Sequence, residues 1–175
     1  MVYVTPLTYE TASPKAQAAF EDQIKQHGRI TNMKKTLLHS VPAFEALMTW
    51  YPLQREVAAL IGERATNFYC YAISTTNECL ICSMFFKKIL DDLAIDFSTF
   101  AFTDEENDLI AYGKTLVADA ANIPPALVAR LRSRYSTETF VLLTAFGSMM
   151  IATNLINTAL QVELDEVLLP YTKRG

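Results

Sequence analysis

Glycine is scarce in this chain, with five among 175 residues. The glycine and proline residues, which tend to end helices and strands, are far apart in the sequence. The segments between glycine and proline residues are longer than ordinary β-strands, which run for about five or six residues. Within these segments apolar residues recur three and four positions apart, as they do on one face of an α-helix. The sequence therefore predicts an all-α protein.

Charge is also sparse, with 19% charged residues and a net charge of −4 at pH 7. A chain without a basic field has little to attract a phosphate backbone, so we expect no nucleic-acid partner. Two stretches, 68–86 and 140–160, are strongly apolar, but asparagines such as Asn77 and Asn154 interrupt them and would be costly in lipid. We therefore expect no membrane span.

Cysteine is limited to three residues, and residues 1–6 lack a basic region followed by an apolar stretch. An odd number of cysteines without a secretory signal is typical of a reducing compartment. We therefore expect a cytoplasmic protein. Apolar residues make up 51% of the chain, which is enough for the core of one domain spanning residues 1–175.

The positions of the helix-ending residues predict a single bundle of about seven or eight helices. One helix is expected over 43–51, with Pro52 opening the next, and the run Thr103–Glu106 forms a capping box for another. Two apolar helices, 64–76 and 79–93, are expected to meet at Asn77 and pack as a central antiparallel pair. The long apolar helix 137–160 carries Asn154 and Asn157, whose amides we expect to tie helices or subunits together.

Cys79 and Cys82 form a CxxC pair at the start of the helix 79–93. A helix N-terminus stabilises a thiolate, and two thiols at this spacing can close a disulfide, so the pattern favours reversible dithiol chemistry. Zinc would need two more ligands, and neither His27 nor His39 stands at a ligand spacing from the pair. We expect no metal and no organic cofactor. The alternative is that both cysteines are small buried apolar residues.

Three segments of the chain carry a resemblance to a known family. The helix ending in Ala72-Ile73-Ser74-Thr75-Thr76-Asn77 leads into Cys79-Leu80-Ile81-Cys82, and the segments 30–40 and 149–157 flank it at a distance. Over about residues 28–171 the chain resembles the carboxymuconolactone decarboxylase family, in its alkylhydroperoxidase-D-like branch. The resemblance implies an all-helical bundle that assembles as a homo-oligomer.

The resemblance also implies roles for the two cysteines. Cys82 would be the peroxidatic thiol, which attacks a hydroperoxide, and Cys79 the resolving thiol, which then forms the disulfide that an external thiol reductant reopens. Peroxidase members of the family carry a proton-relay Glu twelve residues before the first cysteine and a His four residues after the second. Asn67 and Phe86 stand at those positions here. Neither side chain transfers protons near neutral pH, so we expect weak peroxidase activity.

Four residues are expected to line the site: Asn67, Phe86, Ser83 and Tyr71. Asn67 would orient water or peroxide or else bond to a neighbouring helix, and Ser83 would bond to a thiolate or to its own helix. Two other functions remain open. One is a non-catalytic scaffold that binds a small apolar ligand or a protein partner between its helices. The other is the lactone decarboxylase activity of the broader family, for which no acid–base residues are found.

Overall fold

Side-chain caps begin several of the helices. The hydroxyl of Ser13 accepts a hydrogen bond from the Ala16 N–H at 3.3 Å, and Ser136 accepts one from Thr139 at 3.1 Å. Thr103 and Glu106 form the predicted capping box. Each cap satisfies a backbone N–H that has no partner within the helix, which fixes the first turn.

The fold was established from a computed structural model, which describes residues 2–173. Over these residues the chain forms nine α-helices and one 3₁₀ helix, close to the seven or eight helices expected. The elements are α1 (Pro14–His27), α2 (Asn32–Leu37), α3 (Val41–Met48), α4 (Trp50–Ile61), α5 (Glu63–Thr76), α6 (Leu80–Asp92), α7 (Asp104–Asp119), α8 (Pro125–Arg134), α9 (Thr137–Ala159) and η1 (Glu166–Lys173). The all-α expectation is confirmed.

One helix boundary differs from the sequence prediction. The helix expected over 43–51 ends at Met48, and the next begins at Trp50. Pro52 therefore lies inside the first turn of α4 and does not open it. A proline is tolerated there because the N–H groups of a first turn have no partners within the helix.

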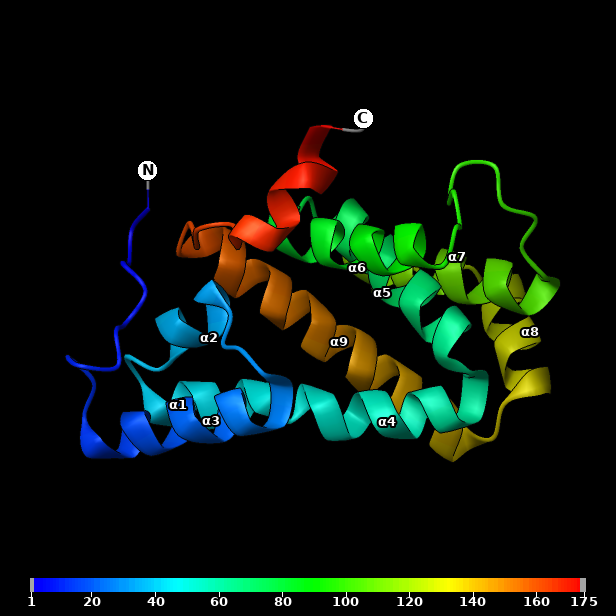
Figure 1. Ribbon diagram of the computed structural model, residues 1–175. Helices are drawn as coiled ribbons and strands as arrows, with labels where there is room; N and C mark the ends of the chain where they lie inside the picture. Colours follow the sequence, from blue (N-terminus) through cyan, green and yellow to red (C-terminus); the bar gives the residue numbers. More distant parts are fainter. Residues whose placement is uncertain (1, 174–175) are drawn as a thin grey trace.

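Helix α5 occupies the centre of the bundle and packs against α4, α6, α7 and α9. Figure 1 shows α9 running obliquely between α4 on one side and α6 on the other, and the structure has contacts across both boundaries. The 3₁₀ helix η1 packs on α6. The turn between α5 and α6 consequently lies close to the C-terminal half of α9.

Helix α9 is 23 residues long, and by length and composition alone it is apolar enough to cross a membrane. Here it packs against α4, α5, α6, α7 and α8, and 33% of its most apolar stretch is buried among the described residues. Its approach to α5 is close at Gly147, where the Tyr69 ring of α5 lies against the helix backbone. The Tyr69 hydroxyl donates a hydrogen bond to the Leu143 carbonyl at 3.0 Å.

Candidate dithiol site

A tight turn between α5 and α6 positions the two cysteines. Glu78 takes a left-handed backbone conformation with φ of 53°, and the Cys79 N–H bonds to the Ser74 carbonyl at 3.1 Å. Cys79 is the N-cap residue of α6, and its carbonyl accepts from the Ser83 N–H at 2.9 Å. This geometry places Cys79 before the helix and Cys82 in its first turn. Both side chains therefore lie at the positive end of the helix dipole.

Both thiols are free and nearly closed off from solvent, with Cys79 1% and Cys82 5% exposed. Cys82 lines a cavity of about 100 Å³ whose wall is formed by residues of α2, α3, α4, α6, α9 and η1 and of the segments that precede α2 and η1. Within the described residues, Cys79 does not contribute to the lining of this cavity. Cys82 is therefore the thiol that a molecule in the cavity would meet.

Asn157 of α9 holds the Cys82 sulfur. Its amide nitrogen donates to Cys82 Sγ at 3.3 Å and to Met33 Sδ at 3.4 Å. Asn157 is 3% exposed, and its amide oxygen has no hydrogen-bond partner among residues 2–173. The same holds for the indole N–H of Trp50, which also lines the cavity. The Asn157 amide oxygen and the Trp50 indole N–H are thus two unpaired polar groups on residues that line the same mostly apolar cavity.

The two thiols differ in acidity. A hydrogen bond from the Cys82 thiol lowers the pKa of Cys79 to about 7 despite burial, and the Cys82 backbone N–H supports the same shift. Donating that bond raises the pKa of Cys82 well above its usual range, and burial raises it further. Asn157 lowers the pKa of both thiols by donating to sulfur. The first proton to leave the pair is therefore lost near neutral pH, with the negative charge on Cys79.

The residues expected around the site are dispersed. Phe86 is buried and lines the cavity beside Cys82. Ser83 is buried next to the pair, where its backbone N–H bonds to Cys79. Asn67 is half-buried on α5 and does not contribute to the cavity lining found within residues 2–173.

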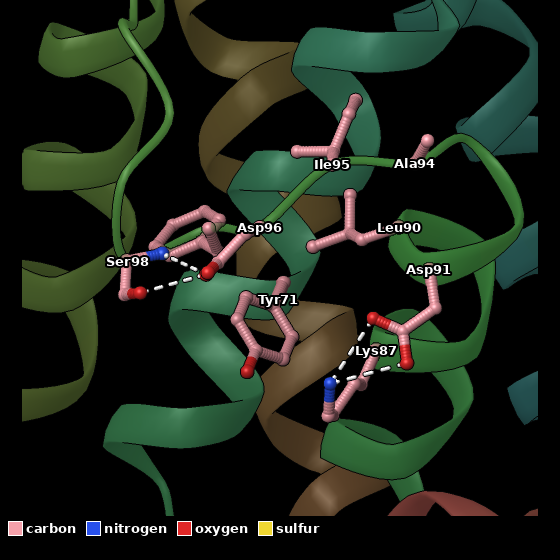
Figure 2. Close-up of a pocket in the computed structure, with 9 residues that line it drawn as sticks. Tyr71, Lys87, Leu90, Asp91, Ala94, Ile95, Asp96 and Ser98 are labelled. Atoms are coloured by element: carbon pink, nitrogen blue, oxygen red, sulfur yellow. Dashed lines mark hydrogen bonds and ion pairs between the residues drawn. The ribbon is translucent and has the colours of Figure 1, made fainter. Parts of the chain in front are cut away.

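Tyr71 lies in a different hollow, of about 660 Å³, formed by α5, α6 and the segment after α6. Figure 2 shows its ring beside Lys87, whose ammonium bonds to both oxygens of Asp91 at 3.1 Å. The Tyr71 ring also packs edge-on against Phe97, with ring centroids 4.8 Å apart. Tyr71 therefore lines this second hollow and not the cavity that contains Cys82, contrary to the expectation.

Most of the cavity residues were not anticipated from the sequence, among them Met33, Trp50 and Asp165. These three come from segments far from the CxxC pair, and no local motif marks them. Asp165 accepts a hydrogen bond from the Asn32 N–H at 2.9 Å, and burial raises the pKa of its carboxyl group. Among residues 2–173, no group of three His, Cys, Asp or Glu side chains could hold a metal ion.

The sequence matches no family model and no curated protein. The fold is similar to that of an uncharacterized peroxidase-related protein from Silicibacter sp. TM1040, with a TM-score of 0.71, 15% identity, and coverage of 94% of this chain and 93% of that one. It is also similar to an alkylhydroperoxidase AhpD core structure, an uncharacterized peroxidase-related protein from Ralstonia eutropha JMP134. That match has a TM-score of 0.75, 13% identity, and coverage of 95% of this chain and 94% of that one. The chain therefore has an AhpD-core-like fold, as the sequence predicts, and carries a CxxC pair within it.

Proposed function

We propose that the protein is a thiol-dependent oxidoreductase of the peroxidase type, which reduces hydroperoxides or exchanges disulfides through Cys79 and Cys82. The observation that supports this proposal is that the two thiols differ in position and in acidity. Cys82 lines the cavity, and Cys79 lies directly behind it with the more acidic sulfur. A substrate in the cavity would meet one sulfur, while the second waits to close the disulfide.

The proposed reaction begins with the proton that the two thiols share. As Cys82 approaches the substrate, its proton passes to the Cys79 thiolate, and the Cys82 sulfur attacks the terminal oxygen of R–O–O–H. The S–O bond forms, the O–O bond breaks, and the leaving alkoxide takes the proton from Cys79 to become an alcohol. Cys82 is then a sulfenic acid.

The second step closes the disulfide. The Cys79 thiolate attacks the Cys82 sulfur and releases hydroxide, which takes a proton from solvent to become water. Two thiols and one hydroperoxide give a disulfide, an alcohol and water. An external dithiol reductant must then reduce the disulfide. Cys79 serves as the base in this scheme, because Phe86 and Asn67 stand where the family's peroxidase members place their relay. We expect slow turnover, because one buried thiolate replaces a relay of two titratable groups.

The test is mass spectrometry of the intact protein after brief exposure to one equivalent of an organic hydroperoxide. The wild type should lose two hydrogens by forming the disulfide, and Cys82→Ser should stay unchanged. Cys79→Ser should gain one oxygen only on longer exposure, because a sulfenic acid forms slowly on Cys82 without the Cys79 base and no thiol resolves it. Unmodified thiols in the wild type would contradict the proposal.

The cavity itself favours a second candidate, the binding of a small apolar ligand without catalysis. Its lining is largely aliphatic and aromatic, and solvent hardly reaches either thiol. Under this hypothesis the cysteines are packing residues. A hydroperoxide would then leave both thiols intact, while a small apolar compound would raise the melting temperature.

We also propose that the protein acts as a homo-oligomer in a reducing compartment. Helix α9 leaves Val141 60% and Leu155 55% exposed, and Leu80 beside Cys79 is 57% exposed. A second copy could cover these apolar side chains, which cost free energy in water. Light scattering coupled to gel filtration would measure the number of subunits.

A further inference from the structure

In the Asn157 amide, the nitrogen donates hydrogen bonds and the oxygen accepts none from the described residues. Its nitrogen bonds to two sulfur atoms, Cys82 Sγ at 3.3 Å and Met33 Sδ at 3.4 Å, while its oxygen has no partner within the part of the chain that the structure describes. A buried amide oxygen without a hydrogen bond costs free energy, so most such groups are paired. An unpaired amide oxygen on a residue that lines a cavity can gain a partner from a molecule bound there.

The neighbouring asparagine on α9 provides a contrast. Asn154 is fully buried, and neither atom of its amide is paired within residues 2–173, yet it is not among the residues lining the cavity. Asn157 differs because it bonds to Cys82 and lines the cavity. Its unpaired oxygen is therefore the buried polar atom whose residue both bonds to the reactive sulfur and lines the cavity wall.

We infer that Asn157 is a catalytic residue that orients the substrate: its amide nitrogen holds the Cys82 sulfur, and its amide oxygen accepts the O–H of a short-chain alkyl hydroperoxide. This inference rests on the proposed function. The hydrogen bond fixes the terminal peroxide oxygen beside the sulfur that attacks it, which is the orientation the displacement needs. That oxygen keeps its hydrogen when the S–O bond forms, so Asn157 accepts throughout and transfers no proton.

Trp50 provides the complementary donor on the cavity wall. Its indole N–H is buried and has no partner among the described residues, and an indole nitrogen is a donor only. A donor suits the second peroxide oxygen, on which negative charge develops as the O–O bond breaks. Asn157 and Trp50 together would satisfy both oxygens of R–O–O–H.

The cavity volume limits the alkyl group. An engineered apolar cavity of about 150 Å³ in another protein accommodates benzene. The cavity here measures about 100 Å³ and must also hold the peroxide oxygens. We therefore expect tert-butyl hydroperoxide to react faster than cumene hydroperoxide, which carries a phenyl ring.

The test compares two rates in each variant. Disulfide formation with tert-butyl hydroperoxide reports on substrate orientation, and alkylation of Cys82 by iodoacetamide reports on the thiolate alone. Asn157→Leu should lower the ratio of the first rate to the second by about tenfold or more, as expected for one hydrogen bond made in the transition state. Asn157→Asp should slow alkylation, because a negative charge faces the sulfur, yet keep the ratio near the wild-type value, because an acceptor oxygen remains.

Asn154→Leu is the matched control, one turn away on α9 and equally buried. It should leave the ratio unchanged. An unchanged ratio in Asn157→Leu, or an equal fall in Asn154→Leu, would overturn the inference while leaving the proposed function standing. If the wild type is alkylated but no hydroperoxide closes its disulfide, the proposed function fails and the inference with it. Should Asn157→Leu not fold, Asn157→Ser removes the amide oxygen with less change in polarity and should lower the ratio likewise.

Discussion

Replacing Gly147 by alanine is expected to destabilise the protein by about 1 to 5 kcal/mol. Gly147 is buried on α9, at the point where that helix meets α5. A Cβ atom there would overlap the Tyr69 hydroxyl oxygen and would lie 2.9 Å from Leu116 Cδ1 and 3.1 Å from Tyr69 Cζ. Tyr69 has no free space to retreat into, because its side chain is fully buried.

Three contributions set this magnitude. Overpacking a well-filled core costs about 1 to 3 kcal/mol. Displacing the Tyr69 hydroxyl also breaks its 3.0 Å hydrogen bond to Leu143, and a buried hydroxyl left unpaired costs about 1 to 3 kcal/mol more. The higher helix propensity of alanine compared with glycine offsets about 1 kcal/mol of this total.

Urea denaturation followed by circular dichroism would measure the change. Ala145→Gly, on the exposed side of the same helix, gives the helix-propensity contribution by itself. The decisive comparison repeats Gly147→Ala in a Tyr69→Phe background, where the overlapping oxygen is gone. The cost of the alanine should then fall by at least about 1 kcal/mol, because the two residues are in contact. Equal costs in the two backgrounds would refute the reasoning.

Three further predictions concern acidity and capping. The ultraviolet absorbance of the Cys79 thiolate, isolated by difference from Cys79→Ser, should titrate with a midpoint near the pKa of about 7. The midpoint should move to higher pH in Cys82→Ala, which lacks the donor thiol, and a fixed midpoint would contradict the assignment. Burial lowers the pKa of Lys34 to about 8 from 10.5. Between pH 8 and pH 10.5 the Lys34 amine is therefore protonated in the unfolded chain but neutral in the folded protein. The folded state consequently becomes more stable as the pH rises through this range. The free energy of unfolding of the wild type relative to that of Lys34→Met should accordingly increase by at most about 3 kcal/mol from pH 7 to pH 11. Urea denaturation at each pH would measure it, and a difference in unfolding free energy that does not change with pH would exclude the pKa shift. Thr103→Ala removes the side chain that caps the N-terminus of α7 and should lower stability by about 1 kcal/mol in thermal unfolding, whereas Thr103→Ser should retain most of it.

Local sequence determined most of the secondary structure. The Thr103 cap acts within four residues of the helix that it begins, so the sequence alone located that helix start. The position of the CxxC pair at the start of α6 is equally local. The boundary at Thr49 was not predicted, because a proline signals a first turn without saying which of its positions it occupies.

The composition of the site was decided by tertiary structure. Phe86 was predicted because the resemblance places a relay histidine at its position, one turn from Cys82 on the same helix, and it lines the cavity. Tyr71 and Asn67 face other surroundings, because their position on α5 is set by how that helix packs and not by their distance from the cysteines along the chain. Asn157 lies 75 residues from Cys82 and reaches its sulfur only because α9 crosses α6. The sequence determined a dithiol at a helix start, since that depends on four consecutive residues. Which sulfur lines the cavity, and which amide holds it, depends on contacts between distant helices, so only the tertiary structure could decide them.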